Sequence, residues 1–250
     1  MKYGLQMYTM RDITKTDLEG AIRAAADMGY AMIETAGLFG NAPEKVKAIA
    51  DECGIEICST HTGPYDIFAH FEDTIALHKK LGCKNIVIPG ADYYNREAIT
   101  FTVDSINRYQ PLIEAEGMKL FYHNHHKELL PNLDGQITLE EFANRTNVGF
   151  EIDVFWALNA GYDPVALLEK YKDRVGFVHL KDGIPSANKS WEVTGKSTGC
   201  GQVPVEDVRK WAIAAGVPMI VESEGLIPSG TEEARNCINF LKSLDAKDGN

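Results

Sequence analysis

The sequence predicts a single (β/α)8 barrel, the TIM barrel fold class, from three observations. Eight short apolar segments alternate with amphipathic helical segments along the 250 residues. The apolar segments start roughly every 25–35 residues, with one longer interval before the last of them. No Pro- or Ser-rich linker interrupts the series, so we expect one domain over residues 1–250, with a disordered tail from about residue 245.

Each predicted strand is a nearly continuous apolar run, as expected for parallel strands that are covered on both faces. An open doubly wound sheet would normally carry a Gly-rich loop after its first strand, and YTMRD (8–12) is not such a loop. The predicted strands are 3–9, 31–36, 56–62, 85–90, 119–125, 148–155, 175–182 and 218–225.

Helical periodicity is clear in the segments 16–29, 43–54 and 163–174. Thr or Asp at a helix start and Gly at a helix end are typical capping residues. The predicted caps are Thr16, Gly29, Gly54, Gly117, Asp163 and Gly216. His70 and His78 fall on a helix that we expect outside the barrel, where they have no role.

Composition and charge exclude several classes of partner. The formal net charge of −11 repels a phosphate backbone, so we expect no nucleic acid partner. No run of about 18 apolar residues exists, and the N-terminus lacks a signal-peptide pattern, so we expect no membrane partner. The five cysteines are scattered without CxxC spacing, which is typical of a reduced, cytoplasmic protein.

Ionisable residues gather at the predicted strand ends, where barrel enzymes carry their catalytic groups. These residues are Glu34, His61, His123, His125, Glu128, Glu151, Asp153, His179, Lys181, Asp182, Glu222 and Glu224. Like charges in one low-dielectric mouth repel each other unless they are protonated or held by a cation. We therefore expect one divalent metal ion, and the mixture of Asp, Glu and His suits Mn²⁺, Mg²⁺, Co²⁺ or Zn²⁺.

The segment KLFYHNHHKELL (119–130) contains three histidines within four positions. Strand alternation sends His123 and His125 to one side and Asn124 and His126 to the other. We expect His123 near the metal and His125 with Glu128 near the substrate. His126 is expected at the surface or in a supporting position.

Four motifs, in this order, resemble the xylose-isomerase-like barrels known as sugar phosphate isomerases/epimerases. They are FYHNHHKE (121–128), FEIDVFWALNAGYDP (150–164), FVHLKDG (177–183) and IVESEG (220–225). The resemblance spans the chain from GLQMYTMRD (4–12) onward. The superfamily also includes hydroxypyruvate isomerases, inosose dehydratases and endonuclease IV-like enzymes.

The resemblance implies a ligand set for the metal. The epimerase branch uses a Glu, an Asp, a His and a Glu from strands five to eight, and the last three match Asp153, His179 and Glu222. The matching position on strand five holds His123, which we expect as the fourth ligand. A strand five of this kind is similar to that of the inosose-dehydratase-like branch, which eliminates water from a keto-sugar or keto-polyol.

The implied activity is isomerisation or epimerisation of a keto-sugar or sugar derivative. The implied chemistry is proton abstraction next to a carbonyl, with a metal-stabilised enediolate. Glu222 is the expected base, with His123 or His125 as the complementary acid. Lys181 either stabilises developing negative charge or forms a salt bridge with a carboxylate of the mouth.

A carbohydrate is the implied partner, and no P-loop or basic loop supports a phosphate on it. Homo-oligomerisation is left open. The Gly-rich segment 195–208 is either a flexible lid or the lead-in to a helix. Aromatic rings near strand ends, at Tyr8 and Tyr65, either shield a sugar face or pack. The expected substrate-binding residues are Glu34, His61, Glu128 and Trp156.

Three alternatives remain. An inosose-type dehydratase is favoured by His123. An endonuclease IV-like repair enzyme would carry a His three positions after Asp153, where this sequence has Trp156. An inactive sugar-binding barrel would lack metal ligands, whereas the three expected on strands six to eight are present.

Overall fold

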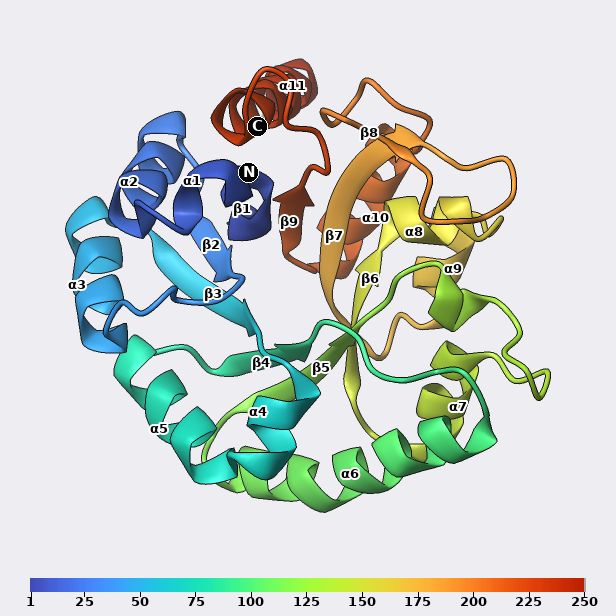
Figure 1. Cartoon of the computed structure of the whole chain (residues 1–250). Helices are drawn as coiled ribbons and strands as arrows, with labels where there is room; N and C mark the ends of the chain where they lie inside the picture. Colours follow the sequence, from blue (N-terminus) through green and yellow to red (C-terminus); the bar gives the residue numbers. More distant parts are fainter. Residues whose placement is uncertain (250) are drawn as a thin grey trace.

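The computed structural model describes residues 1–249. Eight parallel strands form the centre, and helices surround them (Figure 1). The strands pair in the order β6-β5-β4-β3-β2-β1-β9-β7, and an additional pairing of β6 with β7 closes the ring. The predicted (β/α)8 fold class is confirmed.

All eight predicted strands are present. Seven end earlier than predicted, whereas β7 continues two residues beyond its predicted end at residue 182. The barrel strands are β1 (Tyr3–Gln6), β2 (Met32–Thr35), β3 (Glu56–His61), β4 (Asn85–Ile88), β5 (Lys119–His123), β6 (Gly149–Asp153), β7 (Val175–Ile184) and β9 (Met219–Glu222).

The end of β7 forms a hairpin that the sequence did not predict. Its last residues pair antiparallel with β8 (Thr194–Lys196) at the mouth of the barrel. Beyond β8, the carboxylate of Asp182 accepts backbone N–H groups from Gly199, Gly201 and Val203. These hydrogen bonds hold the Gly-rich segment as a lead-in to the next helix, so the lid alternative is not supported.

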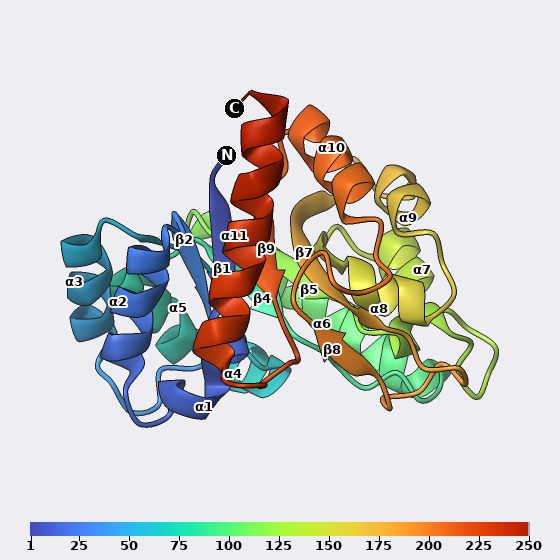
Figure 2. The same cartoon turned by 90° about the horizontal axis from the view of Figure 1, so that it is seen from above.

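Figure 2 shows the helices from a second direction, with α11 alongside β1 and β9. The outer helices are α2 (Leu18–Met28), α3 (Pro43–Cys53), α4 (Pro64–Ala69), α5 (Phe71–Leu81), α6 (Arg96–Ala115), α7 (Thr138–Arg145), α8 (Val154–Asn159), α9 (Pro164–Lys170), α10 (Val205–Ala215) and α11 (Gly230–Asp248). Short turns η1 (Met7–Met10), α1 (Arg11–Thr14) and η2 (Lys127–Leu129) follow β1 and β5.

Four of the six predicted helix caps are confirmed. Gly117 has a positive φ but lies one residue beyond Glu116, the cap of α6. Gly29, Gly54 and Gly216 each end a helix with a positive φ, which glycine adopts without a steric penalty. Asp163 caps α9. Asp17, rather than the predicted Thr16, caps α2, because its carboxylate accepts the N–H of Gly20.

Two further expectations are corrected. His78 lies on the outer helix α5, but its side chain is buried and its Nε2 is 2.6 Å from Thr60 Oγ1, so it holds the helix against the barrel. The expected disordered tail is helical as far as Asp248, and residue 250 lies outside the described residues.

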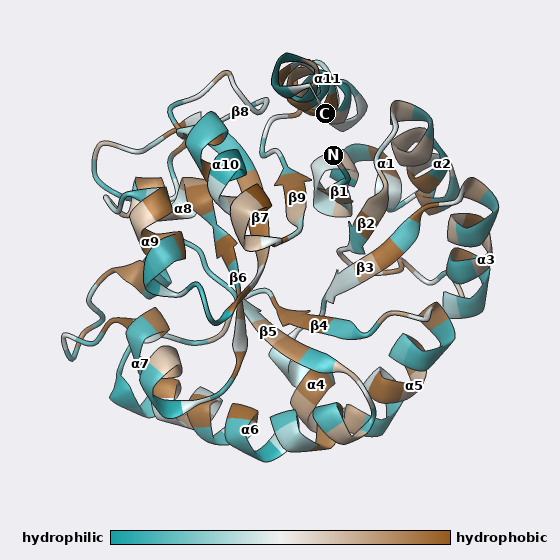
Figure 3. Ribbon diagram, turned by 180° about the vertical axis from the view of Figure 1, so that it is seen from behind, coloured by the Kyte–Doolittle hydropathy of each residue, from teal (hydrophilic) through white to brown (hydrophobic). Residues whose placement is uncertain are grey.

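The lower half of the barrel interior is an apolar floor. Figure 3 shows apolar residues along much of the strands and hydrophilic stretches on the outer helices. A Cβ atom on Gly176 or Gly149 would lie 2.1 or 2.4 Å from the ring of Phe121, so these glycines leave the space that the ring fills. We call the following buried residues the apolar floor: Cys58, Val87, Phe121, Phe177 and Ile220.

The five cysteines are free. No helix in the described part of the chain has the length and the apolar character that crossing a membrane requires.

Candidate metal centre and active site

Two groups of acids and histidines fill the upper half of the barrel interior. We call Asp153, His179 and Glu222 the upper group, and His61, His123, Glu151 and His179 the lower group. Within each group the possible ligand atoms all lie within 4.8 Å of one another. The imidazole of His179 belongs to both groups and separates them.

The upper group leaves one carboxylate oxygen without a hydrogen bond. His179 Nδ1 lies 2.9 Å from Glu222 Oε2 and 3.9 Å from Asp153 Oδ2. Asp153 Oδ1 accepts the N–H of Trp156, whereas the buried Oδ2 has no hydrogen-bond partner among the described residues. Burying such an oxygen is unfavourable unless a cation satisfies it.

The donor set of the upper group fits a divalent metal ion. Two carboxylates and one imidazole suit Mn²⁺, Mg²⁺, Co²⁺ or Zn²⁺. Three protein ligands would leave coordination positions for water and substrate, as in catalytic rather than structural sites. Asp153 ends β6, His179 lies on β7 and Glu222 ends β9, so three strands of the barrel fix the set.

The other nitrogen of His179 is held by carboxylates beneath it. Its Nε2 lies 2.8 Å from Glu34 Oε1 and 3.1 Å from Glu151 Oε2, and Gln6 Nε2 donates to the same Glu34 oxygen. A proton on Nε2 leaves the lone pair of Nδ1 free for a metal. Burial alone would lower the pKa of His179, but the charges of Glu151 and Glu34 raise it well above its usual value. A metal would therefore have to displace a proton from Nδ1.

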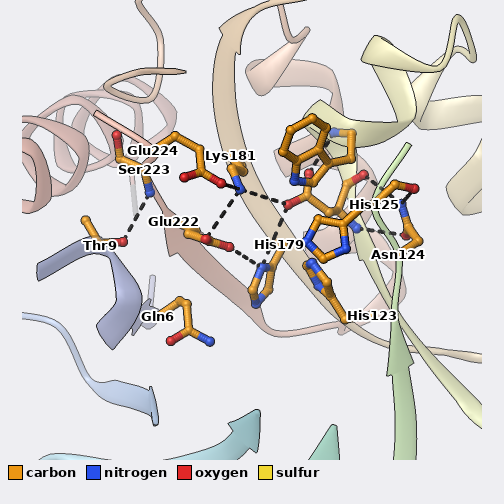
Figure 4. A network of polar contacts seen from close by, with 12 residues as sticks. Gln6, Thr9, His123, Asn124, His125, His179, Lys181, Glu222, Ser223 and Glu224 are labelled. Atoms are coloured by element: carbon orange, nitrogen blue, oxygen red, sulfur yellow. Dashed lines mark hydrogen bonds and ion pairs between the residues drawn. The ribbon is translucent and has the colours of Figure 1, made fainter. Parts of the chain in front are cut away.

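Lys181 places a positive charge beside the upper group (Figure 4). Its Nζ lies 2.6 Å from Glu224 Oε1, 3.3 Å from Glu222 Oε1 and 3.9 Å from Asp153 Oδ2. Of the two alternatives given for Lys181, these contacts match the salt bridge with carboxylates of the mouth. Burial alone would raise the pKa of Glu222, but Lys181 and His179 hold it well below its usual value. Glu222 is therefore ionised at neutral pH.

His123 lies one layer below the position expected for a fourth ligand. In the sheet register it pairs with Glu151, whereas Asp153, two residues further, pairs with His179. Glu151 Oε2 contacts His61 Nε2 at 2.8 Å and His123 Nδ1 at 3.1 Å. Burial lowers the pKa of His123 well below its usual value, so its imidazole is neutral. The structure thus places His123 in the lower group.

Glu151 lies at the centre of the lower group, although the sequence prediction gave it no role. Burial, with the nearby charge of Glu34, raises its pKa. The signal in the sequence was its spacing: it stands two residues before Asp153 on one strand, and alternate residues of a strand face the same side.

A cavity of about 680 Å³ opens beside the upper group at the mouth. His125 is half-buried on its wall, and burial lowers its pKa to about 3, so the ring is neutral. Trp156 also lines the cavity, and its indole is almost fully buried. The lining side chains that carry polar atoms or aromatic rings are Tyr8, His61, His123, His125, Trp156, Trp191, Glu222 and Glu224.

The other expected substrate-binding residues lie at different depths. His61 lines the cavity, whereas Glu34 is fully buried and does not. Glu128 is buried as well. Its carboxylate accepts hydrogen bonds from the hydroxyl of Tyr122 and the backbone N–H of His125. Glu128 therefore holds the turn that carries His125.

His126 is buried, so the surface alternative is wrong. Its ring centroid lies 4.5 Å from that of Trp191 and 5.2 Å from that of Trp156. The alternation argument fails here because β5 ends at His123, and the chain then turns into η2. Trp191 comes from the loop between β7 and β8, and no motif in the sequence marked it.

A closed barrel whose strand ends bring carboxylates and imidazoles together has the arrangement of TIM-barrel enzymes, and here these groups could hold a metal ion. The family model described as "Xylose isomerase-like TIM barrel" matches residues 22–244. The chain is therefore a member of the xylose isomerase-like TIM barrel family.

Similar proteins carry related names. An inosose dehydratase of Geobacillus kaustophilus is 28% identical over 63% of this chain and 59% of its own length. A sugar phosphate isomerase/epimerase from Parabacteroides distasonis has a TM-score of 0.83 and 24% identity, covering 96% of this chain and 97% of its own. A probable 3-DHS dehydratase from Bacillus anthracis has a TM-score of 0.75 and 14% identity, covering 97% and 99% of the two chains. The two structures share the fold, and the match to the curated relative spans 59% of that protein's length.

Proposed function

We propose that the protein is a divalent-metal-dependent enzyme that removes a proton next to the carbonyl of a keto-sugar and thereby isomerises or epimerises it. The observation that carries the proposal is the upper group, in which a buried oxygen of Asp153 without a hydrogen bond lies close to His179 and Glu222. Asp153, His179 and Glu222 would hold the metal. When bound, the metal would polarise the substrate carbonyl and offset the negative charge that proton removal creates.

Glu222 is the proposed base. It lines the cavity, and Lys181 keeps it in the carboxylate form that accepts a proton. His125 lines the same cavity as a neutral imidazole, and it is the proposed partner that returns a proton to the substrate. His123 lies deeper and also lines the cavity, so it is the second candidate for that role. Lys181 acts through the carboxylates that it contacts.

Elimination of water is the second candidate function. The base and metal would act in the same way, but His125 would then deliver its proton to a leaving hydroxyl group. The curated relative named an inosose dehydratase favours this candidate. The product distinguishes the two functions, because an isomer keeps the mass of the substrate and a dehydration product lacks one water.

The proposal rests on residues 1–250 acting as one domain. A cytoplasmic location stays a prediction, and homo-oligomerisation stays open.

Metal content is the first test. Elemental analysis should find about one Mn, Mg, Co or Zn per chain in the purified protein, because the upper group forms one set of ligands. Asp153→Ala should lose the metal, and Asp207→Ala, which removes a carboxylate on the outer helix α10, should keep it.

Proton exchange is the second test. Keto-sugars incubated with the loaded protein in D₂O should gain deuterium next to the carbonyl, and Glu222→Ala should abolish the exchange. No metal under any loading condition would overturn the proposal. Three zinc ions per chain would instead favour the endonuclease IV-like alternative.

A further inference from the structure

A second cavity adjoins the catalytic one at the mouth of the barrel. Its volume is about 800 Å³, and it lies between the start of α4, the loop after β4 and the first turns of α6. His125 and Trp191 line both cavities, so the two spaces share one wall. We call this second cavity the aromatic groove. Apart from His125, its lining residues have no part in the function proposed above.

Exposed aromatic side chains are concentrated in the aromatic groove. Among the described residues, the aromatic side chains most exposed to solvent are Tyr8, Phe39, Tyr65, Tyr94, Phe101 and Trp191, and the last four line the groove. Phe101 is 73% exposed and Tyr65 is 72% exposed, although large apolar side chains are normally covered. Such a collection beside a catalytic cavity indicates a surface that a ligand covers.

The charged groups of the groove are acidic. Asp92 and Glu97 are exposed on its wall, where their carboxylates can accept hydrogen bonds from hydroxyl groups. Neither cavity has a lysine or arginine in its lining. Arg11, near the rim, donates to the backbone carbonyls of Ser223 and Glu224 and is thereby occupied. The aromatic groove therefore disfavours a phosphate group.

We propose that the aromatic groove holds a second sugar ring, so that the substrate is an uncharged glycoside rather than a free or phosphorylated monosaccharide. The proposal rests on the function given above, because the first ring would occupy the catalytic cavity. Aromatic faces pack against the C–H faces of a pyranose ring, and the carboxylates of the wall bind its hydroxyl groups. The acidic wall is the reason to assign a sugar rather than an apolar aromatic group.

Binding of small sugars tests the proposal. Isothermal titration of the full-length protein would compare D-glucose and glucose 6-phosphate with cellobiose, maltose and trehalose. At least one disaccharide should bind about tenfold tighter than glucose, equivalent to roughly 1.4 kcal/mol. Phe101→Ala should remove most of this gain. Leu112→Ala, which truncates another exposed apolar side chain of α6 outside the groove, should keep it.

Several outcomes would overturn the proposal. One is that the disaccharides bind no tighter than glucose, or do not bind. Another is that glucose 6-phosphate binds tighter than every disaccharide. If phenyl β-D-glucoside binds tighter than the disaccharides, the groove prefers an aromatic group to a second sugar ring, and the proposal is wrong. Metal content, measured on the same samples, separates the two hypotheses. A disaccharide preference in a protein that never binds metal would refute the proposed catalysis and leave the groove assignment standing.

Discussion

The carboxylate of Asp182 anchors the loop between β8 and α10, and its removal is the change whose effect can be worked out most fully. It accepts the N–H groups of Gly183 at 2.8 Å, Gly199 and Gly201 at 2.9 Å, and Val203 at 3.0 Å. The side chain is 1% exposed. We predict that Asp182→Ala destabilises the protein strongly.

The magnitude follows from the four hydrogen bonds. A hydrogen bond to a charged group contributes about 1.5–3 kcal/mol. Gly199 is exposed and Gly201 is half-buried, so their amides can regain hydrogen bonds to water, whereas the buried amides of Gly183 and Val203 cannot do so easily. We therefore expect a loss of about 3 kcal/mol in the free energy of unfolding. For a protein of this size, that loss corresponds to a fall in Tm of about 6–12 °C.

Urea denaturation and differential scanning calorimetry measure these quantities. Asp182→Asn is the matched control, because the amide keeps one acceptor oxygen in nearly the same shape, and we expect about half the loss. Hydrogen exchange at Gly199 and Gly201 should accelerate in the alanine variant. An Asp182→Ala variant whose free energy of unfolding lies within about 1 kcal/mol of the wild-type value would refute the anchoring role.

Three other predictions concern the metal centre, the pH dependence of stability and the floor of the barrel. Glu34→Gln should weaken Mn²⁺ binding by about 10–100-fold in calorimetric titrations, because His179 loses the carboxylate that orients its ring; an unchanged affinity would contradict this. Burial alone would raise the pKa of Asp245, but its hydrogen bonds hold that pKa below the usual value. The ionised carboxylate therefore stabilises the folded protein above about pH 3.9, and this contribution is lost as the pH falls through the lowered pKa. Asp245→Asn should therefore unfold at lower urea than the wild type near neutral pH, and the difference should vanish in acid. Gly176→Ala should cost about 1–3 kcal/mol, because its Cβ would meet the ring of Phe121, and Phe121→Leu should recover part of that loss in a double-mutant cycle.

The fold could be predicted because its signal is periodic. The regular spacing of apolar segments needs no knowledge of which strands touch, and the glycine caps mark the helix ends independently. Asp153, His179 and Glu222 were expected as a set from the motifs that resemble the family. The strand-end argument alone placed them among a dozen ionisable residues near one mouth, because the carboxyl ends of the strands of a barrel meet there.

The layer of each side chain could not be predicted, because it depends on the register between strands. His123 also ends its strand, but β5 stands in a register that pairs it with Glu151, and it therefore lies below the upper group. Glu151 was given no role for the same reason, because the register that brings it beside His123 could not be read from the sequence. His126 was misplaced because alternation holds only inside a strand, and the end of β5 came earlier than the apolar pattern indicated.

The apolar floor decides from which side the buried ionisable groups exchange protons with solvent. Phe121 and Phe177 meet edge to face beneath the lower group, with ring centroids 5.2 Å apart. Apolar side chains cannot relay protons, so protons released by Glu151 or His179 have to leave on the side away from the floor. His61, which contacts Glu151, lines the catalytic cavity and also a second cavity of about 630 Å³ beside α5. A substrate in the catalytic cavity would therefore close one of these two routes, and His61 would keep the buried acids in exchange with water through the other.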